Sequence, residues 1–171
     1  GVQPTSFRCP RLWGSTPVVR ALADLGYTAD LTYPMYFYRE QFEPYFVDLD
    51  EWTQQGSSSL LEVPNFADMV MESADPGLER DRDQWPLFRT RGGAYMLERS
   101  LRFHEFCLER GIDTYLCFYI HPWEFWPMAE QYNFGEATVI PEGFITENCG
   151  PGAVEELRIL LKGLLDAGAT V

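Results

Sequence analysis

The chain has 171 residues, enough for one domain with a sizeable core, and its 15% aromatic content argues against intrinsic disorder. Its 26 acidic and 13 basic side chains give a formal net charge of −13, which excludes the basic surface that nucleic acids require and disfavours an anionic membrane. No apolar run has the length of a transmembrane helix, and the first residues, Gly1 to Thr5, do not resemble a signal peptide. We therefore expect neither nucleic acid nor a membrane as partner, and the compartment stays open.

The first part of the chain is predicted to alternate short strands with one helix. The expected strands cover residues 5–9, 27–32 and 60–63. The helix begins at Pro17, a favourable first-turn residue, and ends at Gly26, with an apolar stripe of Val18, Leu22 and Leu25. Residues 33–46 are too rich in aromatic residues and proline for a regular element, so we expect a loop packed by its own side chains.

The second part begins with a long insertion over residues 65–92, which predicts a lid or binding loop. A helix follows from Gly93 to Arg110, with Gly111 at its end and Leu97, Leu101 and Leu108 toward a core. Further strands are expected over 113–120 and 169–171, a loop over 122–150 and a helix over 153–167.

Strands that alternate with helices imply a parallel sheet buried on both faces. Long connections follow the strands and short ones follow the helices, so the loops gather at the carboxyl ends of the strands. The predicted fold class is α/β, and this asymmetry favours a partial β/α barrel over an even doubly wound sheet. Residues 1–171 are expected to form one portion of a single domain.

Three polar residues fall where this fold would gather them: Arg8 and His121 at strand ends and Asp30 near one. His121 is a candidate general acid or base, Asp30 could set its tautomer, and Arg8 could orient a carboxylate. Structural roles remain open beside these. His121 could be a core histidine, Asp30 could cap a turn, and Arg8 could form an ion pair.

The four cysteines do not form a CxxC pair, which excludes a zinc ribbon or a thioredoxin-type motif. Buried thiols are the simpler expectation for Cys9, Cys107, Cys117 and Cys149. The second histidine, His104, lies in the middle of a predicted helix, where a surface or packing role is expected.

Four segments resemble, in order, motifs of the polysaccharide deacetylase superfamily, carbohydrate esterase family 4. They are Phe7-Arg8-Cys9-Pro10, the segment from Leu25 to Pro34, Leu60-Leu61-Glu62-Val63-Pro64 and the segment from Tyr119 to Phe125. The resemblance implies a distorted β/α barrel whose first strands are missing from this sequence. It also implies hydrolysis of acetyl amides or esters on a polysaccharide or amino sugar, with an acetylated glycan as the partner.

The resemblance also implies roles for single residues. His121 would protonate the leaving amine, Asp30 would tune His121, Arg8 would orient the catalytic base, and the backbone N–H of Arg11 would help to bind the oxyanion. A divalent metal, zinc or similar, is implied as well. The Asp-Asp pair and the His-x-x-x-His segment that hold it in the family do not occur here. The metal ligands would come from a missing N-terminal half or a second chain, and the chain alone is expected to be inactive.

Aromatic residues on the predicted active face could line a glycan groove, and Trp13, Tyr33 and Trp123 are the candidates for substrate binding. Arg11 and Leu31 stand where the family usually has aromatic residues, which bears on substrate choice. Two other functions stay open on the same fold: a non-catalytic glycan-binding or assembly module, and a hydrolase of small cyclic amides.

Overall fold

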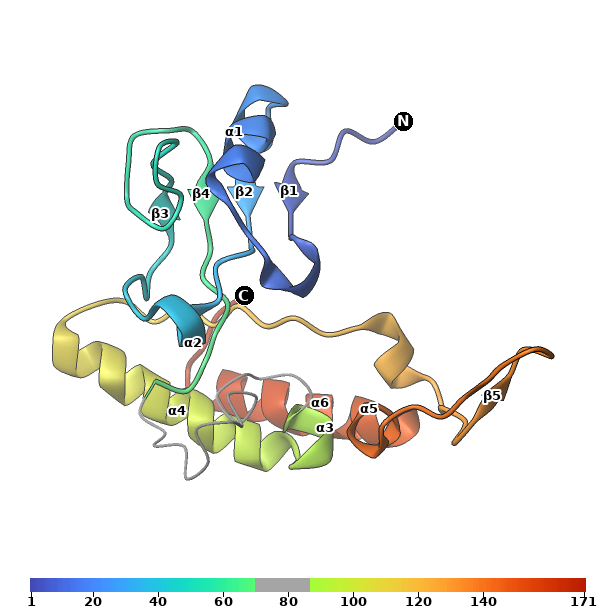
Figure 1. Cartoon of the computed structure of the whole chain (residues 1–171). Coiled ribbons are helices and arrows are strands. Elements are labelled where there is room, and N and C mark those ends of the chain that lie inside the picture. Colours follow the sequence, from blue (N-terminus) through green and yellow to red (C-terminus); the bar gives the residue numbers. More distant parts are fainter. Residues whose placement is uncertain (70–86) are drawn as a thin grey trace. The chain divides into compact units, whose positions relative to one another are not determined.

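The computed structural model describes residues 1–69 and 87–171. The chain divides into two compact units (Figure 1). The first unit contains Gly1–Glu72 and Phe103–Phe118, and the second contains Ser73–Arg102 and Tyr119–Val171.

The first unit is built on a four-stranded sheet in the order β1-β2-β4-β3 (Figure 1). The strands are β1 Ser6–Phe7, β2 Ala29–Asp30, β3 Tyr45–Phe46 and β4 Leu61–Glu62. β1, β2 and β4 are parallel, and β3 pairs with β4 in the antiparallel sense. The α/β class is confirmed, but the sheet is mixed because β3 forms within the segment expected to be a loop. The described residues do not close their strands into a barrel.

The register of this sheet brings the ends of the parallel strands level with one another. Phe7 lies opposite Asp30, and Asp30 lies opposite Glu62. The chain leaves all three strands at the same edge, which in parallel sheets is where functional groups collect.

Helix α1, Thr16–Asp24, confirms the predicted first helix. Its buried residues are Val19 and Leu22. Leu25 was expected on the apolar stripe but is exposed, because it is the C-cap residue where the helix ends. Gly26, at φ 79°, turns the chain away, and the Tyr27 N–H then donates to the Leu22 carbonyl.

An aromatic cluster packs the segment between β2 and β4, as the sequence predicts. The Tyr33 ring lies 5.2 Å from Tyr38, 5.9 Å from Tyr45 and 6.0 Å from Trp52, measured between centroids. The segment is more regular than expected, since it also contains the helical turn α2, Met35–Tyr38.

Helix α4, Gly93–Arg110, has the predicted bounds, and it begins in the second unit and ends in the first. Its buried face was assigned wrongly: Leu101 and Leu108 are exposed, whereas Met96, Phe103 and Cys107 are buried. The reason is that two apolar stripes run along this helix, and leucine spacing alone does not choose between them. Phe103 packs against Phe66 and Phe106, with centroid distances of 5.3 and 5.9 Å.

The second unit contains the short helix α3, Leu87–Thr90, the start of α4 and helix α6, Pro151–Asp166. α6 confirms the predicted last helix. α4 and α6 approach closely at two glycines: a Cβ on Gly93 would lie 2.0 Å from the Glu156 carbonyl oxygen, and one on Gly163 would lie 2.2 Å from Leu97. These glycines allow the two helices to lie side by side (Figure 1).

Three other predicted elements need correction. Residues 113–120 form one isolated bridge, Asn65 to Cys117, instead of a strand, and they are half-buried or exposed, whereas a central strand of a parallel sheet is covered on both faces. Residues 169–171 are not a strand. The loop over 122–150 contains the 3₁₀ helix η3, Pro122–Phe125, the hairpin β5 Tyr132–Asn133 with β6 Thr138–Val139, and the short helix α5, Gly143–Thr146. Of the predicted insertion over 65–92, residues 70–86 lie outside the described part.

All four cysteines are free thiols, and Cys107 is the buried one. Burial raises the pKa of each of the four thiols above its ordinary value. Among the described helices, none has the length and apolar character needed to cross a bilayer.

Candidate functional site

The first unit gathers polar side chains at the carboxyl ends of its parallel strands. Arg8 follows β1, Asp30 ends β2 and Glu62 ends β4. The Arg8 Nε donates to the Leu31 carbonyl at 3.0 Å, and its Nη2 lies 3.2 Å from the Cys117 Sγ. The structure therefore brings Arg8 and Asp30 together, and the guanidinium charge favours the carboxylate form of Asp30.

Asp30 and Glu62 form a fully buried carboxyl pair. The Thr32 hydroxyl donates to Asp30 Oδ1, and the N–H groups of Thr32 and Tyr33 donate to Glu62 Oε1 at 2.9 and 2.7 Å. The remaining oxygens, Asp30 Oδ2 and Glu62 Oε2, receive no N–H or O–H donor from the described residues. A proton held between the two carboxyl groups would give both of these oxygens a partner.

The electrostatics support a shared proton. Burial, with the Asp30 charge as a second cause, raises the pKa of Glu62 to about 9. Burial also raises the pKa of Asp30, although Thr32, Glu62 and Arg8 act in the opposite direction. At neutral pH the pair therefore keeps a proton, chiefly on Glu62.

The turn after β1 holds two residues in the left-handed region, Arg11 at φ 58° and Leu12 at φ 57°. Such backbone is strained for residues other than glycine and is concentrated at functional sites. Trp13 follows with 72% of its surface exposed, and the Arg11 guanidinium lies 5.7 Å from the centre of its ring. Trp13 is thus accessible to a ligand. Tyr33 is fully buried, which leaves no exposed ring face for a sugar to stack on.

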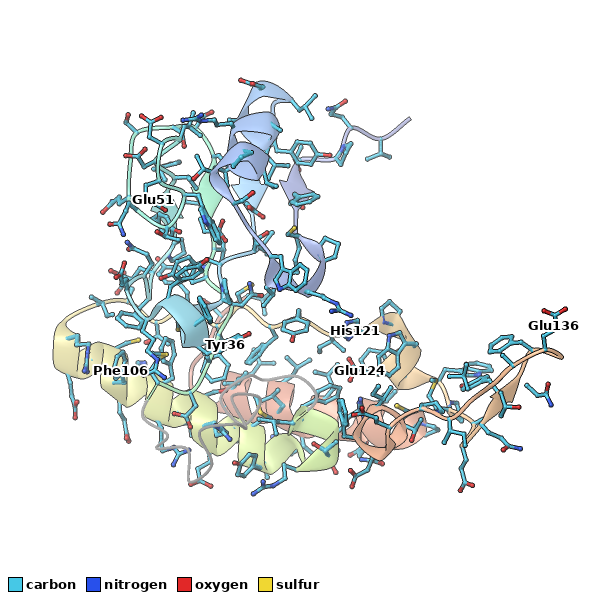
Figure 2. All side chains as sticks on the ribbon, in the orientation of Figure 1. Tyr36, Glu51, Phe106, His121, Glu124 and Glu136 are labelled. Carbon is cyan, nitrogen blue, oxygen red and sulfur yellow. The ribbon has the colours of Figure 1, made fainter. Side chains whose placement is uncertain are left out.

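The second unit places His121 next to a buried carboxylate at the start of η3 (Figure 2). The His121 Nδ1 lies 3.1 Å from Glu124 Oε1, and the His121 backbone N–H donates to the same oxygen at 2.8 Å. The His121 side chain is 39% exposed, whereas that of Glu124 is fully buried. This arrangement presents an accessible imidazole with one ring nitrogen fixed by an acceptor.

The other oxygen of Glu124 is held by Arg89 of α3. Arg89 Nε donates to Glu124 Oε2 at 2.6 Å, and both side chains are fully buried. Arg89 Nη1 in turn donates to the carbonyls of Phe144 and Glu147 at 2.9 and 2.6 Å. The carboxylate thus has fixed partners on both oxygens.

Trp123 completes this cluster of aromatic and charged groups. Its ring stacks on His121 at a centroid distance of 5.2 Å and an interplanar angle of 27°, and the Arg89 guanidinium lies 5.6 Å from its centre. Its structural role is to support the imidazole, while its binding of substrate stays a prediction.

Of the predicted trio, Arg8 and Asp30 belong to the first unit and His121 to the second. Glu62, Glu124 and Arg89 had no predicted role. Glu62 lies within one of the four segments that resemble family motifs, and Glu124 follows His121 at the spacing of a capping box. The sequence therefore contained a signal for both residues. Arg89 had none, because it lies far from both in sequence.

The described residues do not contain three or more His, Cys, Asp or Glu side chains grouped so that they could hold a metal ion. The Asp30–Glu62 pair offers two carboxyl groups, and one keeps its proton, whereas a catalytic zinc needs about three protein ligands. These residues do not fit the divalent metal that the resemblance implies.

Comparison of the chain with family models, with curated proteins and with solved structures finds no match.

Proposed function

We propose that the chain forms part of a hydrolase that removes acetyl groups from a polysaccharide or an amino sugar. One observation carries the proposal: an accessible histidine, His121, is fixed at Nδ1 by a buried carboxylate, as a general acid requires. Arg8 and Asp30, which the resemblance assigns to the same chemistry, lie together at one edge of the first unit's sheet.

In the proposed reaction, water adds to the acetyl carbon and the C–N bond breaks. His121 transfers a proton from Nε2 to the leaving amine, so that a free amino sugar and acetate result. The resemblance gives Arg8 the orientation of the catalytic base, Asp30 the tuning of His121 and the Arg11 N–H the oxyanion contact, and these three residues lie in the first unit. A divalent metal belongs to the proposal, with ligands from another segment or a second chain.

The test is acetate release from an N-acetylated amino sugar oligomer by the complete gene product, assayed with added zinc. We expect the wild type to release acetate. We expect His121→Ala to lower the rate to about 1% of the wild-type rate or less, since general acid catalysis contributes at least about 100-fold. His104→Ala is the matched control, because it removes the other histidine. Equal rates for wild type and His121→Ala would reject His121 as the acid. Ammonia or ring opening without acetate would point to a cyclic-amide hydrolase.

A glycan-binding module is the second candidate, and the exposed rings of Trp13 and Trp126 favour it. Indole faces stack on sugar rings and need no metal. This candidate would be supported over the hydrolase if the chain binds the oligomer, if Trp13→Ala weakens that binding, and if no acetate is released under any condition.

A further inference from the structure

The contacts of Glu124 go beyond what local structure requires. A glutamate three residues after a 3₁₀ N-cap needs only one oxygen to accept the N-cap backbone N–H. An exposed side chain could do this. Glu124 is instead fully buried, with its second oxygen on the Arg89 guanidinium.

This burial is costly for stability alone. Removing two charges from water carries a desolvation penalty that a buried ion pair often does not recover relative to apolar side chains. The arrangement does give precise placement, since Arg89 is fixed by the carbonyls of Phe144 and Glu147 in and after α5, and Gly150 donates its N–H to the Glu124 carbonyl at 2.8 Å. Both the backbone and the carboxylate of Glu124 are therefore held before they contact His121.

The Nδ1 of His121 lies 3.1 Å from Oε1 of Glu124, whose other carboxylate oxygen is paired with the Arg89 guanidinium. Nδ1 must then carry the hydrogen of the neutral ring, because an unprotonated Nδ1 and a carboxylate oxygen are both acceptors and cannot form a hydrogen bond with each other. Proton transfer accordingly falls to Nε2. The resemblance gives the tuning of this histidine to Asp30, whereas the carboxylate at Nδ1 is that of Glu124.

We infer that Arg89 and Glu124 are positioning residues that hold His121 as the Nδ1–H tautomer with its ring against Trp123. The tautomer follows from the structure of the second unit, and its catalytic consequence rests on the proposed function. Partners that orient a metal-ligating histidine are typically worth about 10- to 100-fold in activity, and we expect a similar contribution here.

The tautomer can be measured directly, because the chain has two histidines. In the ¹⁵N-labelled His104→Gln chain, His121 is the one remaining imidazole, and its ring nitrogen shifts report where the hydrogen resides. We expect the Nδ1–H form of the neutral ring to predominate. A predominant Nε2–H form in this chain would overturn the inference without any further variant.

The variant that tests the pair replaces both buried charges together. Arg89→Met with Glu124→Met leaves no lone buried charge, and apolar side chains of similar volume are tolerated at such pairs. We expect the ring to shift toward the Nε2–H form and acetate release by the complete gene product to fall about 10- to 100-fold. The matched control is Glu155→Met with Arg158→Met, an exposed ion pair on α6 in the same unit, which should change neither quantity.

The outcomes separate the two proposals. A shifted tautomer in a protein that never releases acetate would keep the positioning role and reject the hydrolase. Acetate release with an unchanged tautomer in the Met pair would reject the positioning role alone. A tautomer that responds to Asp30→Asn and not to the Met pair would assign the tuning to Asp30 and also overturn the inference.

Discussion

Replacing Glu62 by Gln removes one ionisable group from the first unit and keeps the shape of the side chain. A glutamine oxygen can still accept from the N–H groups of Thr32 and Tyr33, and its amide can donate to Asp30 as a protonated Glu62 would. The variant therefore reproduces the protonated state at every pH.

The expected effect follows from the pKa of Glu62, which burial raises from 4.5 to about 9. Between these values the folded state keeps a proton that the unfolded state releases, so the free energy of unfolding of the wild type falls as pH rises. At about 1.4 kcal/mol per pH unit, the loss between pH 4.5 and 7 is about 3 kcal/mol. Glu62→Gln does not suffer this loss.

We therefore expect the two proteins to be similarly stable near pH 4.5 and the variant to be more stable by about 3 kcal/mol at pH 7. Urea unfolding at a series of pH values measures this difference. Glu105→Gln, an exposed carboxylate on α4, is the control, for which the difference should stay flat. A wild-type minus Glu62→Gln difference that does not change with pH would refute a protonated Glu62 in the folded state.

Three further predictions address the remaining features. Phe103→Ala deletes a fully buried ring and should lower the free energy of unfolding by about 3–5 kcal/mol in a denaturant titration; a loss below about 1 kcal/mol would contradict its place in the core. Gly93→Ala should lower the free energy of unfolding by about 1–3 kcal/mol despite the better helix propensity of alanine, because its Cβ would lie 2.0 Å from the Glu156 carbonyl oxygen. Gly143→Ala, with open space around it, is the control and should not lower stability. Equal melting temperatures for the two variants would refute the close contact. Arg8→Lys should reduce acetate release by the complete gene product, because one ammonium cannot reach both the Leu31 carbonyl and the Cys117 sulfur, and an unchanged rate would remove Arg8 from the proposed chemistry.

Local signals predicted the three longest described helices, α1, α4 and α6. Pro17 and Gly26 bounded α1, and Gly93 and Gly111 bounded α4, because these residues act through backbone geometry that does not depend on the rest of the fold. The short parallel strands were also found, since β-forming residues stopped by proline need no distant information.

Strand pairing and the choice of the buried helix face depend on residues distant in the sequence, so local patterns did not predict them. β3 forms because β4 offers it an edge, while residues 113–120 have strand composition but contribute one bridge. The buried stripe of α4 depends on Phe66, a residue far along the chain. Arg89 reaches Glu124 across 35 positions of sequence, so no spacing rule could have joined them.

The four free thiols also allow motions of the chain to be followed by alkylation. A thiol reacts with an alkylating reagent as the thiolate, so the raised pKa of all four thiols slows labelling, and Cys107, which is buried, reacts only when its sulfur becomes exposed. Cys107 lies in the first unit, and Cys149 is the cysteine of the second, where its Sγ donates to the Ile145 carbonyl at 3.2 Å. Alkylation rates read peptide by peptide would therefore show whether the two units open together or one before the other, with no label added to the natural sequence.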